Sequence, residues 1–456
     1  MLKKHNKKDM KYKKSRFNYI HKYSDGRLRM YNSMVGTKSL LQVNPTCSIQ
    51  VQEALKSEII DSTLLSEDKL QVLYQKGYIV SQKYDEEKAL ELRKMNILSN
   101  DKVLSIIIMP TEECNFRCKY CYETFKKGKM SNKIQEAILK YVQKNIKNYT
   151  ELSVIWFGGE PLEAIDVIEK LSKAFIRICK TARKTYSASI TTNGFNLTPE
   201  NYQKLYECNI YGYQITIDGC KEQHDSQRIL QDGSGTFQKI INNLIYIRDH
   251  PKRGTAFAIR TNFTKQIMSY LDEYIDFFQS NFGKCKQFSL FIQTVSDWGE
   301  ERVNDFTEEI ISPKHKEILS KLKEYNVNLN MPGHCHGLDC STAVCYAAKV
   351  SSIVIGSDGH LYKCTRDFEM PENQVGELSN NGELILNENW QLWLNRVAEK
   401  KPKCNNCFFE ANCLRAVCPF GMVSGEKEIF CSPEKVNLGS FLEVFNDNLF
   451  TVNEKC

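Results

Sequence analysis

Three cysteines within a short run, Cys114, Cys118 and Cys121, are the residues of this chain best suited to chemistry. Their spacing is C-x3-C-x2-C. Three thiolates on one loop can ligate three irons of a four-iron cluster, which leaves the fourth iron without a protein ligand. An iron with an open position can bind a substrate or cofactor, whereas a cluster with four protein ligands mainly transfers electrons. A zinc loop, or three unrelated buried thiols, is the alternative interpretation.

The elements around this loop predict a parallel sheet. Apolar strands are expected at 103–109, 152–157, 187–192, 211–217, 255–262 and 287–294, and helices between them at 132–147, 165–185 and 199–208. Repeated strand–loop–helix units of this length are typical of βα folds, and six units make a partial barrel that is open on one side. The cysteine loop then leaves the carboxyl end of the first strand, where such folds place their chemistry.

Polar or glycine-rich segments follow the next strands as well. The second strand is followed by Gly158, Gly159, Glu160 and Pro161, the third by Thr192 and Asn193, the fourth carries Thr216 and Asp218, and the fifth carries Arg260. Together with the cysteine motif, in which Tyr120 is the aromatic residue before the last cysteine, these segments resemble the motifs of the radical S-adenosylmethionine (SAM) enzymes. That resemblance implies an α/β fold, a partial (β/α)6 barrel, with a small α+β domain before it and a cysteine-rich extension after it.

The resemblance also implies roles for these residues. The three cysteines would hold a 4Fe-4S cluster, and the strand-end residues and Tyr120 would contact SAM. Glycines let a backbone approach closely, an acid accepts from an ammonium group, and Arg260 can clamp a carboxylate. His224 and Arg228 lie in a segment similar to another family motif, and a structural hydrogen-bond network is the alternative for them. No catalytic residue is assigned.

A second set of cysteines follows the predicted barrel. It resembles the SPASM extension, which carries two auxiliary 4Fe-4S clusters. By that resemblance, one cluster would be held by Cys404, Cys407, Cys413 and Cys431, and the other by Cys345, Cys364 and Cys418 with Cys340 as the fourth ligand. Cys335 competes with Cys340, and four residues instead of the usual three separate Cys413 from Cys418. A zinc ribbon is the alternative interpretation.

Composition places the chain among globular proteins of a reducing compartment. Its 456 residues include 18 cysteines but no apolar signal segment or membrane-length run, so we expect cytoplasmic metal ligation, without disulfides or membrane attachment. Residues 1–30 hold 11 Lys and Arg but only 2 Asp and Glu, which predicts a solvated basic tail on a slightly acidic protein. Attraction to an acidic peptide or nucleic acid is the alternative, but nucleic acid is not expected as a partner.

We expect a basic tail at 1–30, an accessory domain at 31–102, the barrel at 103–310, the SPASM extension at 335–435 and a C-terminal tail at 436–456. The segment 31–41 is predicted to be a strand or turn that enters a helix, followed by helices at 48–57 and 66–76, a strand at 77–81 and a helix at 86–95. This mixture resembles the peptide-recognition domains of peptide-modifying radical enzymes.

The resulting hypothesis is a maturase of a ribosomally made precursor peptide with a leader. A 5′-deoxyadenosyl radical would install a thioether between a Cys sulfur and a carbon, and ferredoxin or flavodoxin would donate electrons. The alternatives are formylglycine formation of the anaerobic sulfatase-maturase type, carbon–carbon cross-linking of a peptide, and a non-enzymatic iron–sulfur electron carrier or zinc-binding adaptor.

Overall fold

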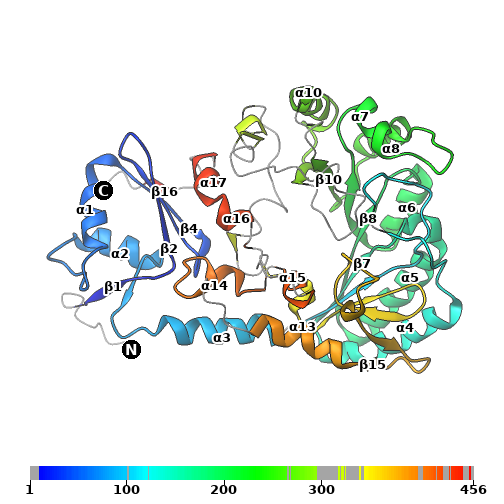
Figure 1. Ribbon diagram of the computed structural model, residues 1–456, viewed down its shortest axis with the longest axis horizontal. Coiled ribbons are helices and arrows are strands. Elements are labelled where there is room, and N and C mark those ends of the chain that lie inside the picture. The colour runs from blue at the N-terminus through cyan, green and yellow to red at the C-terminus, as the bar shows by residue number, and fades with distance from the viewer. Residues whose placement is uncertain are drawn as a thin grey trace.

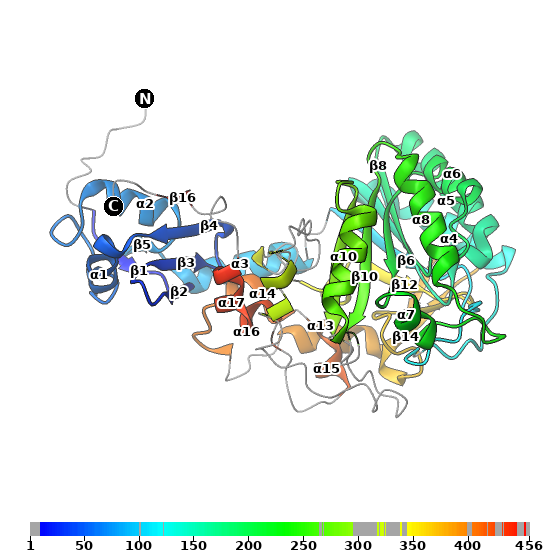
Figure 2. The same cartoon turned by 90° about the horizontal axis from the view of Figure 1, so that it is seen from above.

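The protein forms two lobes joined by helix α3 (Glu86–Ser99) (Figures 1 and 2). The computed structural model describes residues 10–99, 102–121, 123–263, 267, 269–294, 317–318, 320–322, 324, 338–339, 344–398, 404–416, 418–424, 431, 433–444 and 451–452.

A parallel sheet forms the centre of the larger lobe, which we call the barrel lobe. Its first six strands are β6 (Val103–Ile108), β7 (Glu151–Trp156), β8 (Thr185–Thr192), β9 (Ile210–Thr216), β10 (Ala256–Phe263) and β11 (Phe288–Thr294). They lie in chain order across the sheet, and every neighbouring pair is parallel. All six predicted strands and the predicted α/β fold class are therefore confirmed.

Helices cover one face of this sheet (Figure 2). They are α4 (Asn132–Asn145), α5 (Ile165–Ala182), α6 (Pro199–Glu207), α7 (Lys221–Gln227), α8 (Phe237–Asp249) and α10 (Leu271–Phe282). Apolar residues at helical spacing give α5 a buried stripe that includes Ile168, Leu171 and Phe175. Side chains on the opposite face of the strands line the cavity described below.

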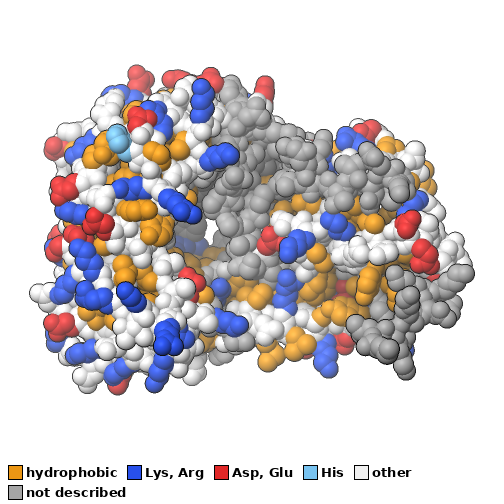
Figure 3. Space-filling view, turned by 180° about the vertical axis from the view of Figure 1, so that it is seen from behind, with side chains coloured by type: hydrophobic (Ala, Val, Ile, Leu, Met, Phe, Trp, Pro, Cys, Tyr) orange, Lys and Arg blue, Asp and Glu red, His pale blue; other side chains and the backbone are white. Residues whose placement is uncertain are grey.

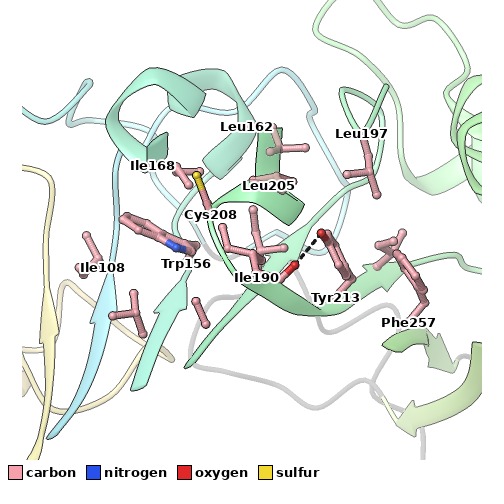
Figure 4. Close-up of a cluster of buried hydrophobic side chains, with 14 of the residues drawn as sticks. Ile108, Trp156, Leu162, Ile168, Ile190, Leu197, Leu205, Cys208, Tyr213 and Phe257 are labelled. Atoms are coloured by element: carbon pink, nitrogen blue, oxygen red, sulfur yellow. Dashed lines mark hydrogen bonds between the residues drawn. The ribbon is translucent and has the colours of Figure 1, made fainter. Parts of the chain in front are cut away.

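The main core lies between the strands and these helices (Figure 4). Trp156, Ile190 and Tyr213 come from adjacent strands and are almost completely buried. The ring of Tyr213 stacks on Phe257 with centroids 4.6 Å apart, and its hydroxyl donates to the Ile210 carbonyl at 2.8 Å. Burial of large side chains at successive strand positions thus fixes which face of each strand turns toward the helices.

Four further strands extend the sheet beyond β6. Strand β12 (Ser352–Ile355) pairs parallel to β6, and β13 (His360–Tyr362), β14 (Gln374–Leu378) and β15 (Leu384–Leu386) follow antiparallel. The sheet therefore has ten strands, and its β6 edge is covered by residues that lie far downstream in the chain. Sequence analysis did not predict this pairing.

The smaller, N-terminal lobe contains a four-stranded sheet. Strands β2 (Asn18–Lys22), β3 (Leu28–Asn32) and β4 (Gly36–Val43) are antiparallel, and β16 (Thr451–Val452) pairs parallel to β4. A separate pair joins β1 (Tyr12–Lys14) to β5 (Ile79–Ser81). Helices α1 (Pro45–Ala54) and α2 (Glu67–Gln75) complete the lobe, as predicted.

Both of the expected tails contain regular secondary structure. The solvated basic tail predicted at 1–30 is a set of strands from Tyr12 onward, because Phe17, Leu28 and Met30 are fully buried. The segment 31–41, expected to be a strand or turn entering a helix, contains the end of β3 and most of β4, and helix α1 follows. The C-terminal tail predicted at 436–456 contains α17 (Leu438–Val444) as well as β16.

The N-terminal lobe packs against the cysteine-rich segment 404–444, which contains α14 (Glu410–Cys413), α15 (Phe420–Val423) and α16 (Pro433–Val436) as well as α17 (Figure 1). Arg16 forms a half-buried ion pair with Glu410 at 3.1 Å, and the hydroxyl of Tyr23 donates to the Leu442 carbonyl at 3.0 Å. Helix α13 (Glu388–Ala398) carries the chain from the ten-stranded sheet toward this segment.

The surface of the barrel lobe is mixed in charge on the face shown in Figure 3, where Lys and Arg are interspersed with Asp and Glu. Among the described residues, no helix combines the length and apolarity that crossing a membrane requires.

Candidate active site

A cavity of about 170 Å³ lies where strands β6 to β10 end. Its wall includes the cysteine loop, the glycines after β7, and polar side chains of β8, β9 and β10. The predicted cysteines Cys114, Cys118 and Cys121 all line it. The carboxyl ends of parallel strands therefore bring together segments that are far apart in the sequence.

The three thiols are buried enough to change their chemistry. Burial raises the pKa of each, to about 12 for Cys121, and the neighbouring thiols raise the pKa values of Cys114 and Cys121 further. A metal ligand must be the thiolate, and a bound cation reverses this unfavourable ionisation. Three converging thiols in a partly closed cavity therefore fit an iron–sulfur cluster held by this loop.

The two glycines after β7 let its end pack directly on the cysteine loop. A Cβ atom at Gly158 would lie 2.3 Å from the Thr111 carbonyl oxygen, and one at Gly159 would lie 2.3 Å from that of Glu113. Gly158 also has a φ of +121°, which other residues rarely adopt. The backbone N–H of Glu160 donates to the Glu113 carbonyl at 2.9 Å, so the two segments form one wall of the cavity.

Glu160 lies behind this wall and joins the ends of β7 and β8. Its carboxylate is fully buried and accepts from the Thr192 hydroxyl at 2.6 Å and from the Asn193 backbone N–H at 2.7 Å. Burial raises its pKa to about 7, although these hydrogen bonds oppose the shift. Pro161 begins the short helix η3 (Pro161–Ala164), where it packs in the interior. Thr192 and Asn193 do line the cavity.

Asp218 also lies behind the wall, in a buried network under the cysteine loop. It accepts from the hydroxyl of Tyr120 and, at 2.8 Å, from the backbone N–H of Asn262. The Tyr120 hydroxyl in turn accepts from the Arg228 guanidinium at 2.6 Å and from the Asn262 side chain at 3.0 Å. Burial raises the pKa of Asp218, and Arg228 opposes that shift.

His224 extends the same network. Its Nδ1 accepts from the Asp218 backbone N–H at 3.2 Å, and its Nε2 lies 3.1 Å from the Thr236 hydroxyl. The Thr236 hydroxyl donates to the Arg228 carbonyl at 2.7 Å. The structural alternative that the sequence left open for His224 and Arg228 is therefore present, and Arg228 additionally reaches the cavity.

Polar side chains from the middle strands face the cavity. Thr216 and Gln214 of β9 line it together with Arg260 of β10. The Arg260 Nε is buried and has no hydrogen-bond partner among the described residues. A guanidinium with an unused donor in a cavity suits a carboxylate ligand, and the predicted site residue Arg260 fits that role.

Comparison with known proteins identifies this domain. A family model described as the radical SAM superfamily matches residues 108–278, which include the cysteine loop and strands β7 to β10. Residues 108–278 therefore form a radical SAM domain, and the protein is an enzyme that carries it.

Relatives of this radical SAM enzyme include maturating enzymes. It is 25% identical over 336 residues to the cysteine-type anaerobic sulfatase-maturating enzyme of Clostridium novyi (strain NT), covering 67% of this chain and 85% of that enzyme. It is 24% identical over 258 residues to the radical SAM cyclopropyl synthase TigE of Paramaledivibacter caminithermalis, a match that covers 52% of each chain.

Solved structures share the fold of this radical SAM enzyme. Native anSMEcpe with bound AdoMet has a TM-score of 0.58 and 18% identity, covering 75% of this chain and 96% of that one. Streptococcus suis SuiB bound to the precursor peptide SuiA has a TM-score of 0.50 and 15% identity, covering 89% and 95%.

An acidic residue that lines the cavity was not among the predicted site residues. Glu123 lines the cavity two residues after Cys121, and burial, followed by the nearby Glu112, raises its pKa to about 8. Its Oε1 is buried and has no hydrogen-bond partner among the described residues. The available signal was an acid two residues beyond the last cysteine of the run, but only the fold shows that this acid faces the cavity.

The second set of cysteines falls into two groups. Cys345, Cys364 and Cys418 pack against the barrel core. Burial raises the pKa of Cys345, and the nearby thiols of Cys364 and Cys418 raise it further. The second group contains Cys404, Cys407, Cys413 and Cys431. Burial raises the pKa of Cys413, and the nearby thiols of Cys407 and Cys404 raise it further. Burial also raises the pKa of Cys404, as do the nearby thiols of Cys407 and Cys431. The predicted ligand Cys340 and its competitor Cys335 lie outside the described residues.

Binding of a single metal ion, such as zinc, requires several ligand side chains that converge on one point. Among the described residues, no three Cys, His, Asp or Glu side chains are placed to hold a single metal ion. Lys435 donates to the Cys431 sulfur at 3.5 Å. Ligation of auxiliary clusters by these seven cysteines remains a prediction.

Proposed function

We propose that this radical SAM enzyme matures a ribosomally made precursor peptide by joining a Cys sulfur to a carbon of another residue in a thioether. The observation that carries the proposal is the division of seven downstream cysteines into two groups in a chain that also has the three-cysteine cavity. A thioether forms with the loss of two hydrogens from the peptide. One leaves as a hydrogen atom and the other as a proton and an electron, and an auxiliary redox centre can accept that electron.

In this proposal Cys114, Cys118 and Cys121 hold the 4Fe-4S cluster that SAM contacts. Arg260 binds the SAM carboxylate, and the exposed backbone of Gly158 and Gly159 binds its amino group. When bound, cluster and SAM supply the one-electron chemistry that removes a hydrogen atom from an unactivated carbon. The protein orients the reacting groups and excludes water from the cavity.

The partners and compartment follow from this chemistry. An enzyme that depends on reduced clusters requires a cytoplasmic electron donor such as ferredoxin or flavodoxin. The N-terminal lobe is our candidate for binding the leader of the peptide, because it packs against the segment that carries the second cysteine group. The hydrogen bond from Arg16 to the Cys407 carbonyl, at 3.5 Å, is one direct contact between them.

Formylglycine formation is the second candidate. It is supported by the 25% identity to the cysteine-type sulfatase-maturating enzyme over 85% of that enzyme's length. Both reactions begin with removal of a hydrogen atom from a peptide residue, so the cavity is compatible with each. They differ in the product. A thioether keeps the Cys sulfur and bonds it to a second carbon, whereas formylglycine formation from Cys removes the sulfur.

Mass spectrometry of a Cys-containing peptide encoded beside this gene, co-expressed anaerobically with the enzyme, tests the proposal. The peptide is reduced and then treated with a thiol alkylator. Loss of two hydrogens per link, with the linked cysteines resistant to alkylation, is the expected result. Loss of two hydrogens with every thiol still reactive points to a carbon–carbon link, and conversion of a Cys to an aldehyde points to formylglycine. The Cys118→Ala variant is the control that must leave the peptide unchanged.

A further inference from the structure

Five side chains connect the cysteine loop to the hairpin formed by β12 and β13. We call Glu112, Lys127, Ser357, Asp358 and Tyr362 the Lys127 cluster. The Lys127 ammonium donates to the Tyr362 hydroxyl at 2.7 Å and pairs with Asp358 at 3.0 Å and with Glu112 at 3.9 Å. Glu112 also accepts from the backbone N–H and the hydroxyl of Ser357, at 3.2 and 3.1 Å.

The Lys127 cluster is more enclosed than the other ion pairs of the loop. The side chains of Glu112, Asp358 and Lys127 are 8%, 27% and 31% exposed. In contrast, Lys126 and its partner Glu369 are 64% and 56% exposed. Charge pairs that are partly withdrawn from water are screened less by salt and hold their geometry better than exposed pairs.

Each side of the cluster leads directly to candidate iron ligands. On the loop, Glu112 precedes Cys114 by two residues. On the hairpin, Tyr362 precedes Cys364 by two residues. Lys127 therefore joins the segment that forms the cavity to the segment that enters the Cys345 group.

An apolar contact lies beside the Lys127 cluster. Met109, Val354 and Tyr362 are buried together, and Phe157 from the cavity wall packs against them. Tyr346, the neighbour of Cys345, packs against the same group. Apolar packing of this kind keeps two segments together, whereas the charged contacts fix one relative position, because they require defined partners.

We propose that Lys127 is a positioning residue that sets the distance between the active-site cavity and the Cys345–Cys364–Cys418 group. This role rests on the proposed function, in which an electron leaves the substrate for an auxiliary centre. Without the Lys127 ammonium, Glu112 and Asp358 are two neighbouring acids with no shared cation. The apolar contact still holds the loop against the hairpin, but the charged contact that fixes their relative position is lost. The protein then still removes hydrogen atoms, but fewer of these events end in product.

The variants Lys127→Met and Lys126→Met test this proposal as a matched pair. Methionine keeps most of the length of the side chain and removes the charge in both. Hydrogen–deuterium exchange of the purified full-length protein is expected to rise in both 111–130 and 352–364 for Lys127→Met and in neither for Lys126→Met. Lys127→Arg keeps the cation and is expected to restore much of the protection against exchange. Asp358→Asn removes the charged partner on the hairpin and is expected to raise exchange in the same two segments.

The chemical readout is the ratio of 5′-deoxyadenosine to modified peptide. We expect Lys127→Met to raise this ratio by about threefold or more while SAM cleavage changes less than that, because small displacements of a site have large effects on rate. Lys126→Met leaves the ratio unchanged.

The two readouts separate the possible failures. Unchanged exchange in Lys127→Met, or loosening of the loop without the hairpin, overturns the link itself. Loosening of both segments with an unchanged ratio shows a purely structural contact and overturns the positioning role. If the wild-type enzyme modifies no peptide, the proposed function fails, and the exchange experiment alone then decides whether Lys127 joins the two segments.

Discussion

Removal of Asp218 is expected to destabilise the protein more than removal of its cationic neighbour Arg228. Asp218 is fully buried, and the Arg228 side chain is 8% exposed with its guanidinium 4.0 Å from the carboxylate. An arginine cannot lose its proton inside a protein, whereas a carboxylate can gain one, and burial already raises the pKa of Asp218. Loss of Asp218 therefore leaves the buried Arg228 charge without its carboxylate, whereas loss of Arg228 leaves an acid that can become neutral.

The magnitudes follow from the contacts. Asp218→Ala removes the hydrogen bonds from Tyr120 and from the Asn262 N–H and leaves Arg228 without its carboxylate, which costs about 3–5 kcal/mol for a broken buried pair. Arg228→Met leaves an acid that can become neutral, so we expect about 1–3 kcal/mol, the cost of an unsatisfied buried group. The double variant should cost at least about 1 kcal/mol less than the sum of the two single variants.

Urea unfolding of the metal-free, reduced protein measures these values. Trp156 is fully buried in the barrel core, so its fluorescence reports loss of that lobe. Asp232→Ala is the control, because Asp232 is exposed and bonds only within its own turn among the described contacts. Equal costs for the two single variants, or costs that simply add in the double variant, would refute the argument.

Three further predictions follow from the site. Burial, followed by Arg228, lowers the pKa of His224 to about 3, so the unfolded chain binds a proton at this residue that the folded protein does not. The contribution of His224 to the free energy of unfolding should therefore fall by about 2 kcal/mol between ~pH 7.5 and ~pH 5, whereas the raised pKa values of Glu160 and Glu123 act in the opposite direction. In urea titrations the difference in unfolding free energy between the wild type and His224→Gln should change by that amount over this range, and a constant difference would contradict it. Gly159→Ala places a Cβ 2.3 Å from the Glu113 carbonyl oxygen, so reconstituted protein should bind less iron and no longer bind SAM in equilibrium dialysis; normal binding would show that the loop can move aside. Cys407→Ala should lower peptide modification more than SAM cleavage, measured by chromatography of both products, whereas Cys118→Ala should abolish cleavage; equal loss of both activities in Cys407→Ala would assign that cysteine to folding.

The parallel strands of the barrel lobe were predictable because their signals are local. Each is a short apolar run bounded by loop residues, and β6 to β10 are each followed by a helix. Strand β12 has the same kind of sequence, but it has only four residues and pairs with a strand that lies far upstream. The error at 1–30 arose because basic residues stand beside buried ones, as Arg16 does beside Phe17 and Arg27 beside Leu28, so the net charge concealed the strands.

The site was predictable in outline for a related reason. Residues that follow parallel strands meet at one edge of the sheet, so the cysteines, Gly158 and Arg260 were expected together. Which side chains line the cavity depends on rotations inside the loops. Glu160 and Asp218 turn inward to bond backbone N–H groups, whereas Glu123 turns to the cavity. No sequence pattern distinguishes these orientations.

The two sheet edges that are closed by distant segments have a consequence for biosynthesis. A ribosome releases β6 long before residues 352–355, and β4 long before residues 451–452. Unpaired strand edges attract other strands, so the nascent chain passes through stages in which both edges need protection. Cys431, the last candidate ligand, is translated before β16. Every candidate iron ligand therefore exists before the N-terminal sheet is complete, which makes closure of that sheet a late step of vectorial folding.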